Sequence, residues 1–255
     1  MTLISEINLK AYFNKGGEAH DFSGKRCVLA ISVGQDYHED QRLYSAIHLL
    51  NESGFSHCKV VVADTLQRHN VDANSTAEAL ALSQQAGQKW LERNAEALAG
   101  LKMDVQVTRW IEELSDPKYS EWRRKVEHKL GECAGLRDAI NSTIEVFIER
   151  LKLRNPDADI EAAAARCREY IIEEIPIIMP LWAEQGYDYV IYPQKMTDAM
   201  AASRTHFVEP SMPDRVRWLP LKFKKRGQPI PFAAAGSFLA NNGNTNSGFT
   251  GRANA

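Results

Sequence analysis

Two short apolar runs, separated by the length of one helix, limit most strongly what this chain can fold into. Residues 26–33 (RCVLAISV) and 59–63 (KVVVA) have the length of strands and carry few polar side chains, as strands buried on both faces require. Gly34 follows the first run, and a helical pattern then extends from about Glu39 to Gly54. Two buried strands joined by a helix form a βαβ unit, which predicts a parallel sheet.

The rest of the chain extends this unit. A polar loop is expected at 64–70 (DTLQRHN), and further strands are expected at 103–110, 187–192 and 215–221. The remaining apolar patterns have the period of helices, which we expect at 73–98, 119–130, 136–153 and 157–174. Pro176 should end the last of these, because proline excludes the preceding residue from helical conformation. The sequence therefore predicts an α/β fold with helices flanking a parallel sheet.

Length and composition favour a single catalytic domain. The chain has 255 residues, of which 44% are apolar and 25% are charged, as in ordinary globular proteins. From Ala233 the composition shifts to Gly, Asn, Ser and Ala, so we expect a domain at 1–232 and a flexible tail at 233–255. Because the sequence contains no signal peptide and no apolar run of transmembrane length, we expect a cytoplasmic protein without membrane contact. We also expect a monomer.

Several classes of site find no support in the sequence. The four cysteines stand far apart without a CxxC pair, and the seven histidines show no HxxxH spacing, so we expect no metal and read the histidines as structural or surface residues. No GxGxxG follows a strand, which argues against a dinucleotide cofactor. The net charge of −2 gives no overall positive field, so a nucleic-acid partner would need a local basic patch.

Three separate positions carry candidate chemistry. Ser32 ends the first strand, where open α/β sheets bind ligands, although a serine there can also simply cap the next helix. Tyr170 and Glu174 are four residues apart and share a helix face, whereas Glu173 is expected to point elsewhere, towards solvent. A hydroxyl and a carboxylate in one place can hold an ammonium group, although such a pair is often an inconsequential surface feature. Tyr192 ends a further strand at the same sheet edge.

Together these segments resemble the tRNA-dependent cyclodipeptide synthase family. The segments AISVGQDY, VVVADTLQRHN, YIIEEIP and VIYP follow one another within residues 26–193, in the order and at the spacing of the family. Gln35 stands where the better-known branch has Asn, and Pro193 stands where it has Gln, which resembles the family's Tyr-Pro branch. The resemblance implies a Rossmann-like fold similar to the catalytic domains of tyrosyl- and tryptophanyl-tRNA synthetases (class Ic).

The resemblance also implies roles and substrates. Ser32 is the implied nucleophile, Tyr170 and Glu174 are the implied anchors of the substrate amino group, and Tyr192 is implicated in late proton transfers. Two aminoacyl-tRNAs would be joined by a ping-pong reaction through aminoacyl-Ser32 and dipeptidyl-Ser32 into a 2,5-diketopiperazine. Because the aminoacyl ester is already activated, neither ATP nor another cofactor is expected. In agreement, the sequence has no HxGH, and residues 195–198 (KMTD) match KMSKS only in part.

Substrate contacts follow from the same resemblance. The residues expected to line the aminoacyl site are Val28, Ala30, Gly34, Gln35, Val60, Val62, Ile177, Val190 and Pro193. Because this lining is apolar and of modest size, a small or medium apolar first amino acid is favoured over a charged one. For tRNA contact we expect Lys89 and Arg93 on the helix after the second strand, with Arg123 and Arg124 as a second cluster.

Two other functions remain open from the sequence. Residues 30–34 (AISVG) approximate the nucleophile elbow of a serine hydrolase, and His206 lies downstream as a triad would require. Against this, the elbow would follow the first main strand rather than several, and no HGGG motif is present. A Rossmann-like RNA-binding protein without enzymatic activity would use the same basic residues but would not depend on Ser32.

Overall fold

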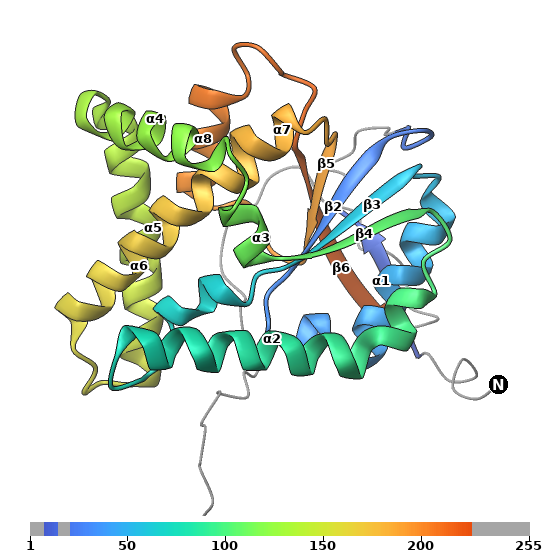
Figure 1. Cartoon of the computed structure of the whole chain (residues 1–255), viewed down its shortest axis with the longest axis horizontal. Helices are drawn as coiled ribbons and strands as arrows, with labels where there is room; N and C mark the ends of the chain where they lie inside the picture. The colour runs from blue at the N-terminus through green and yellow to red at the C-terminus, as the bar shows by residue number, and fades with distance from the viewer. Residues whose placement is uncertain (1–7, 15–20, 226–255) are drawn as a thin grey trace, which may run out of the picture.

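The computed structural model describes residues 8–14 and 21–225, and a six-stranded sheet forms its centre (Figure 1). The strand order is β1-β6-β5-β2-β3-β4. The strands are β1 (Leu9–Phe13), β2 (Arg26–Ile31), β3 (His57–Val62), β4 (Asp104–Arg109), β5 (Tyr189–Tyr192) and β6 (Arg217–Lys225). All neighbouring strands from β6 to β4 pair in parallel, and β1 is an antiparallel addition at the β6 edge.

The five parallel strands follow the Rossmann strand order 3-2-1-4-5, without the sixth strand, which confirms the predicted fold class. The chain proceeds outwards from β2 to β3 and β4, then returns past β2 to add β5 and β6 on the other side. The direction of strand addition therefore reverses between β2 and β5. In open α/β sheets, ligands bind outside the carboxyl ends of the strands at such a reversal.

Helices cover both faces of this sheet (Figure 1). One face is covered by α1 (Asp40–Ser53) and α2 (Thr76–Ala99), and the other by the helices that follow β4 and β5. The helices of that second layer are α3 (Trp110–Leu114), α4 (Tyr119–Glu132), α5 (Ala134–Arg154), α6 (Ile160–Pro176), α7 (Trp182–Glu184) and α8 (Asp198–Phe207). Short turns of other helical types are η1 (Asp36–His38), η2 (Thr65–His69) and η3 (Ile177–Leu181).

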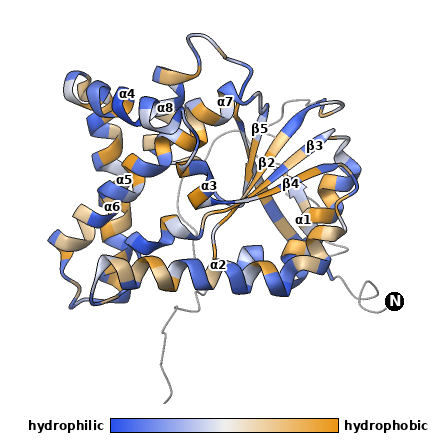
Figure 2. Cartoon of the chain, in the orientation of Figure 1, coloured by the Kyte–Doolittle hydropathy of each residue, from blue (hydrophilic) through white to orange (hydrophobic). Residues whose placement is uncertain are grey.

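Burial on both faces explains why the first strand reads as an unbroken apolar run. Alternate side chains of a strand point to opposite faces. Val28 and Ala30 enter the core beneath α5 and α6, whereas Cys27, Leu29 and Ile31 enter the core beneath α1 and α2. The strands consequently carry apolar residues into both layers, as the hydropathy colouring shows (Figure 2).

The structure differs from the sequence prediction in several elements. The short strand β1 and the helices α3 and α8 were not predicted, and β6 extends to Lys225. The expected polar loop contains η2, whose residues Thr65 and Leu66 are buried. The expected effect of Pro176 was wrong, because the preceding Ile175 is helical, Pro176 itself lies within α6 with φ and ψ of −56° and −32°, and the chain continues directly into the π-helical turn η3. The wider turn tolerates a position without an N–H donor.

Two further expectations concern the C-terminal tail and contact with a membrane. The predicted tail at 233–255 falls outside the described residues. Within residues 8–14 and 21–225, no helix is long and apolar enough to cross a membrane.

A glycine allows α2 to pack against the carboxyl end of β3. Asp64, two residues after β3, is fully buried and accepts a 2.6 Å hydrogen bond from Arg109 Nε. Arg109 also donates to the backbone oxygen of Gln84 on α2, at 2.6 Å. A Cβ atom on Gly87 would overlap the Asp64 carboxylate. The helix can therefore approach this ion pair only where it has no side chain.

This packing predicts that Gly87→Ala destabilises the protein, although alanine is the better helix former. The new methyl group must displace Asp64 from Arg109, so we expect the free energy of unfolding to fall by about 1–3 kcal/mol in urea titrations. Gly131→Ala is the matched control, because a Cβ on this α4 glycine meets no atom within 4 Å. That variant should gain up to about 1 kcal/mol. Equal stability of the two variants would contradict the proposed overlap.

Candidate active site

Ser32 lies directly after β2, beside the last residue of β5. Its side-chain oxygen Oγ lies 2.9 Å from the hydroxyl oxygen of Tyr192. The two residues meet because β2 and β5 are parallel neighbours, with Leu29 in register with Ile191, so that both strands end at the same edge. Ser32 is 8% exposed, so only a small part of its surface reaches solvent. The strand reversal brings together two residues that are 160 positions apart.

Tyr37 adds a second phenol to this arrangement. Its hydroxyl lies 2.9 Å from that of Tyr192, so Ser32, Tyr192 and Tyr37 form a chain of hydroxyl groups. Burial, followed by the neighbouring Tyr37, raises the pKa of Tyr192 well above 10, which keeps its proton in place as a donor. Gly34, at a φ of 83°, lets the backbone turn back after Ser32 so that Tyr37 reaches the site. Tyr37 was absent from the predicted site, although it lies within the segment AISVGQDY.

His38 holds the backbone of Ser32 rather than its hydroxyl. The Ser32 N–H donates to His38 Nδ1 at 2.9 Å, and the backbone oxygen of His38 accepts from Trp90 Nε1 at 3.1 Å. Burial lowers the pKa of His38 to about 3, so the ring is neutral and Nδ1 is available as an acceptor. The expectation of a structural histidine thus holds for His38, but the sequence did not reveal that it supports Ser32.

Tyr170 and Glu174 lie on α6 and face the hydroxyl chain. Both side chains are half-buried. Burial raises the pKa of Tyr170 well above 10, and the nearby Glu174, Tyr192 and Tyr37 add to this shift. Burial also raises the pKa of Glu174 to about 8, and the negative charge of Glu173 contributes. The structure therefore brings Ser32, Tyr170, Glu174 and Tyr192 to one edge of the sheet.

The expected direction of Glu173 was wrong. This residue is 5% exposed and accepts hydrogen bonds from Trp110 Nε1 at 3.0 Å and Arg68 Nη1 at 2.8 Å. Its Oε2 lies 3.3 Å from His69 Nε2 and also accepts from Arg68 Nη2. Burial acts to raise the pKa of Glu173, but the hydrogen bonds from His69 and Arg68 outweigh it and lower the pKa to about 2. The error arose because η2, which carries both basic residues, had been read as a solvated loop.

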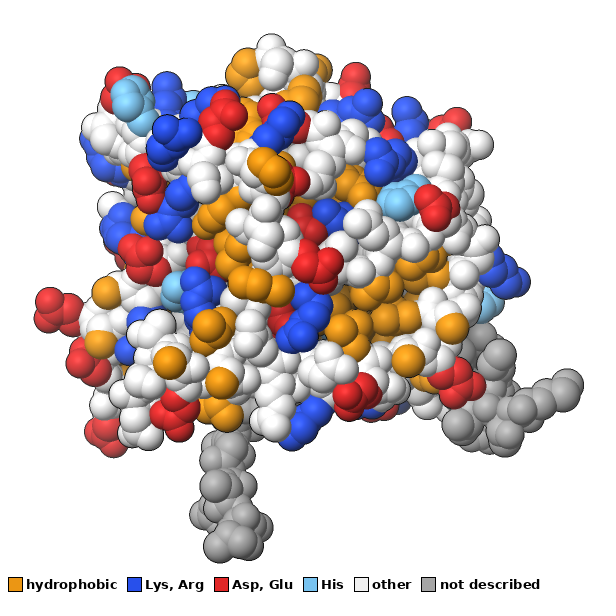
Figure 3. All heavy atoms as spheres, in the orientation of Figure 1, with side chains coloured by type: hydrophobic (Ala, Val, Ile, Leu, Met, Phe, Trp, Pro, Cys, Tyr) orange, Lys and Arg blue, Asp and Glu red, His pale blue; other side chains and the backbone are white. Residues whose placement is uncertain are grey.

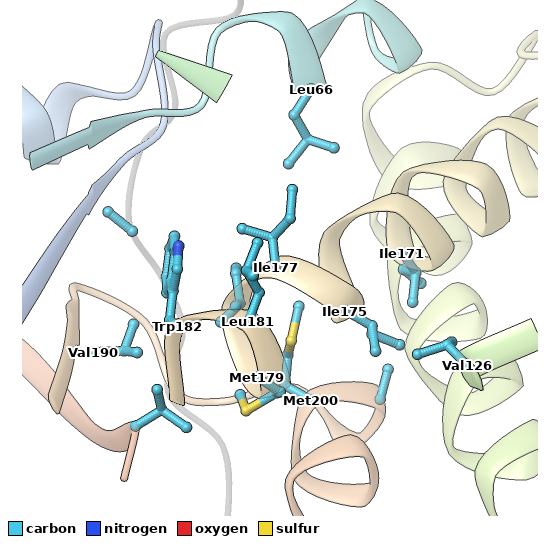
Figure 4. Packing of buried hydrophobic residues seen from close by; sticks show 14 of the residues in the cluster. Leu66, Val126, Ile171, Ile175, Ile177, Met179, Leu181, Trp182, Val190 and Met200 are labelled. Carbon is cyan, nitrogen blue, oxygen red and sulfur yellow. The ribbon is translucent and has the colours of Figure 1, made fainter. Parts of the chain in front are cut away.

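The predicted lining residues fall into two groups. Val28, Ala30, Ile177 and Val190 belong to one core cluster on the α6 side of the sheet. Figure 4 shows Ile177 and Val190 within it.

Val60 and Val62 lie on the opposite face, in the core beneath α1 and α2, and the structure does not bring them together with the first group. Val61 occupies the α6 side in their place, because alternate residues of β3 point to opposite faces.

The remaining predicted contacts of the aminoacyl group lie in loops. Gly34 and Gln35 are exposed after β2. Pro193 is buried, and its carbonyl oxygen accepts a 3.2 Å hydrogen bond from Lys222 Nζ. The side chain of Gln35 is therefore exposed to solvent and does not support Ser32.

The predicted tRNA contacts differ in how free they are to bind phosphate. Arg93 pairs with Glu39 at 2.5 Å, and Arg123 Nε pairs with Glu127 at 2.5 Å. Lys89 and Arg124 are exposed and form no ion pair with the described residues. On the face shown in Figure 3, basic and acidic side chains are interspersed, so a basic surface has to be local.

The described residues form neither a three-residue metal site nor a pair between Ser32 Oγ and a histidine. No group of three His, Cys, Asp or Glu side chains converges as a metal site would require within residues 8–14 and 21–225. His206, the possible triad histidine, has its Nε2 3.4 Å from Cys133 Sγ. In the part of the chain that the structure describes, no histidine hydrogen bonds to Ser32 Oγ.

Known proteins of one family match this chain. A family model described as cyclodipeptide synthase matches residues 20–181. No curated protein sequence matches the chain. Among solved structures, a cyclodipeptide synthase from Fluoribacter dumoffii is 32% identical with a TM-score of 0.80, and the match covers 85% of this chain and 98% of that one.

More distant structures share the fold. A cyclodipeptide synthase from Candidatus Glomeribacter gigasporarum, bound to Phe-tRNAPhe, is 19% identical with a TM-score of 0.63, over 84% of this chain and 93% of that one. A Mycobacterium tuberculosis protein is 16% identical with a TM-score of 0.58, over 80% and 87%. Its description relates cyclodipeptide synthetases to type I tRNA synthetases, in agreement with the predicted similarity of fold.

The raised pKa of Glu174 predicts how stability depends on pH. Between about 4.5 and about 8 the folded state retains a proton that the unfolded state has released. The free energy of unfolding should therefore fall as pH rises through this range, by up to about 1.4 kcal/mol per unit. Glu174→Gln removes this dependence, so the variant should gain stability relative to the parent towards pH 8 in urea titrations. The exposed α5 residue Glu145, changed to Gln, is the control. A constant difference between parent and Glu174→Gln would show that Glu174 titrates normally.

Proposed function

The chain belongs to the cyclodipeptide synthase family, whose members are aminoacyl-tRNA-dependent enzymes, and from this premise we propose that it forms a 2,5-diketopiperazine through esters on Ser32. The observation that carries the proposal is the 2.9 Å contact between Ser32 Oγ and Tyr192 at the strand reversal. The side chains of Tyr170 and Glu174 face this contact from α6. This arrangement supports the assignment of Ser32 as nucleophile, Tyr192 as a proton-carrying hydroxyl, and Tyr170 and Glu174 as ammonium anchors.

The reaction proceeds in two transfers and one ring closure. Ser32 Oγ attacks the ester carbonyl of the first aminoacyl-tRNA, its proton leaves through the hydroxyl chain, and the ribose hydroxyl of the tRNA departs with a proton. The amine of aminoacyl-Ser32, after losing a proton, then attacks the ester carbonyl of the second aminoacyl-tRNA, which forms dipeptidyl-Ser32 and releases that tRNA with a proton on its ribose hydroxyl. The free amine of the dipeptidyl ester finally attacks its carbonyl, which closes the ring and restores Ser32.

Glu174 holds the first amino group and later accepts its proton. The ammonium form binds to an ionised carboxylate, whereas the nucleophilic form requires that a proton be removed. A carboxyl pKa of about 8 is close to that of an α-amino group, so this proton moves between them at little free-energy cost. One residue can therefore serve both steps.

The features that distinguish the Tyr-Pro branch support its assignment here. Gln35 is exposed, so it does not replace the Asn of the other branch beside Ser32. In its place, His38 fixes the Ser32 backbone and Tyr37 extends the hydroxyl chain. These two residues supply the support for Ser32 in this chain.

The other two functions are less well supported. A serine hydrolase needs a histidine at the serine hydroxyl, but His38 contacts the Ser32 backbone and His206 contacts Cys133. A purely RNA-binding role would leave the contact between Ser32 and Tyr192 and the carboxyl group of Glu174 without a use.

The apolar cluster on the α6 side supports a preference for an apolar first amino acid. Val28, Ala30, Val61, Ile177 and Val190 form this side of the core, and none of them carries a charge. A charged side chain placed among them would be buried without a partner, at a free-energy cost of roughly several kcal/mol. Discrimination by one methylene group is worth only about 1–3 kcal/mol, so we expect several related products.

Substitutions at Ser32 and Tyr192 test the acyl-enzyme directly. Ser32→Ala should abolish both the acyl-enzyme and the cyclic product, because the ester has lost its oxygen. Tyr192→Phe should still acylate but form product about 10²–10⁴-fold more slowly, as expected for a lost proton-transfer group. The measurement uses radiolabelled aminoacyl-tRNA, with labelled protein detected on gels and products separated by chromatography.

Ser203→Ala is the control for loss of a serine, because Ser203 is buried and donates to Ala199 within α8. This variant should behave as the parent does. Label on the Ser32→Ala protein, or product formed from free amino acid and ATP without tRNA, would refute the proposal.

The tRNA surface is tested through its salt dependence. Lys89→Glu should raise KM and make log(kcat/KM) about one unit less steep against log salt concentration, because a phosphate contact is lost. Lys102→Glu is the control, since Lys102 is exposed just before β4, at the amino edge of the sheet. An unchanged slope for Lys89→Glu would remove α2 from the tRNA-binding surface.

A further inference from the structure

Adjacent carboxyl groups on α6 differ in their surroundings. Glu173 accepts hydrogen bonds from Arg68, His69 and Trp110, whereas the neighbouring Glu174 faces the hydroxyl chain at Ser32. Arg68 is held in turn, because its Nη1 donates to the backbone oxygen of Thr65 at 3.0 Å. The charge of Glu173 is therefore fixed in position one residue away from Glu174.

The segment that supplies Arg68 also contacts the other substrate anchor. Gln67 hydrogen bonds to Tyr170, while Arg68 and His69 bind Glu173. The start of this segment is held by the buried Asp64, which binds Arg109 and lies against Gly87 of α2. The turn η2 thus connects the carboxyl end of β3 with both anchors on α6.

We propose that Glu173 and Arg68 are positioning residues that set the proton affinity of Glu174, with Glu173 raising it and Arg68 limiting the increase. This inference rests on the proposed role of Glu174 as the anchor of the substrate amino group. A negative charge next to a carboxyl group disfavours its ionisation, and a positive charge beyond it reduces that effect. Glu173 and Arg68 therefore act on Glu174 in opposite directions.

Among the groups around Glu174, Glu173 and Arg68 are the main source of fixed charge. From α6 it is approached by Cys167, Tyr170 and Glu173. From β5 and η1 it is approached by Tyr192 and Tyr37, whose phenols stay protonated at neutral pH. The charged or titratable groups packed nearby from η2 and α4 are Arg68, His69, Tyr119 and Arg123.

Of these groups, two are less suited to tune Glu174. Burial raises the pKa of Cys167 to about 11, so this thiol is uncharged at neutral pH. Arg123 is engaged by Glu127 and Glu169, at 2.5 and 3.4 Å.

Glu173 and Arg68 serve catalysis by matching the proton affinity of Glu174 to that of the substrate amine. The amine must be held as ammonium in one step and must become a nucleophile in a later one. A carboxyl group with an ordinary pKa would hold the proton too weakly to accept it from the ammonium group. Burial makes the larger contribution to the raised proton affinity of Glu174, and the fixed charge of Glu173 adds to it, so the transfer requires no backbone movement.

Two single variants should shift the titration of Glu174 in opposite directions. Glu173→Gln removes the neighbouring negative charge, so the midpoint should move down by roughly one pH unit. Arg68→Gln leaves Glu173 charged and less compensated, so the midpoint should move up. The first measurement is isotope-edited NMR of the Glu174 carboxyl carbon in the free protein. The second is the pH profile of acyl-Ser32 formation in a single turnover with aminoacyl-tRNA.

Three controls keep the test decisive. Arg68→Lys retains the charge and should restore the parent midpoint. The double variant Arg68→Gln, Glu173→Gln leaves no unpaired buried charge, so it should fold if Arg68→Gln alone does not, and its midpoint should move down. Arg215→Gln breaks a 2.7 Å ion pair with Asp188 just before β5 and should leave the midpoint unchanged.

The outcomes separate this inference from the proposed function. Midpoints that shift in the same direction in both single variants, or do not shift, would overturn the tuning by Glu173 and Arg68. The NMR titration requires no activity, so it remains informative if the parent forms no acyl-Ser32, a result that would instead overturn the proposed function. Lower activity with an unchanged pH profile would assign the pair a structural role alone.

Discussion

The reversal of strand order between β2 and β5 is the constraint on which the site depends. Because both strands are central and parallel, their carboxyl ends open at one edge, and Ser32 meets Tyr192 there without any loop having to reach across the molecule. The helical layer between β4 and β5 then has to place α6 against that same edge. The sheet thus supplies Ser32 and Tyr192, whereas the inserted helices supply Tyr170 and Glu174, the proposed anchors of the amine.

Three buried carboxylates connect β3 and the segment after it to neighbouring elements. Asp64 binds Arg109, Glu113 of α3 binds Lys59 of β3 at 2.6 Å, and Glu173 binds Arg68. Each carboxylate has further donors, as Trp182 Nε1 is to Glu113 at 2.9 Å. Removing one partner of such a pair leaves a charge without compensation, which is far more costly than replacing both. The pairs therefore act as fixed connections between elements that are distant in the chain.

The fold and much of the site could be predicted because they follow from local patterns. Continuous apolar runs identify strands buried on both faces, and a spacing of four residues places Tyr170 and Glu174 on one helix face. Tertiary contacts could not be predicted in this way. Glu173 is buried because Arg68, His69 and Trp110 converge on it from other elements, and no local pattern encodes that convergence.

The facing of β3 residues and the role of His38 escaped prediction for a similar reason. Which valines of a buried run face α6 depends on the register of neighbouring strands, and the support of Ser32 by His38 depends on a turn after Gly34.

The chain of hydroxyl groups has a consequence for chemical selectivity. Within the described residues, the hydrogen-bond partner of Ser32 Oγ is the phenol of Tyr192, and the imidazole of His38 is bound to the Ser32 backbone instead of the hydroxyl. On the proposed mechanism, hydrolysis of aminoacyl-Ser32 should therefore be slow, so the ester should persist until the second aminoacyl-tRNA binds.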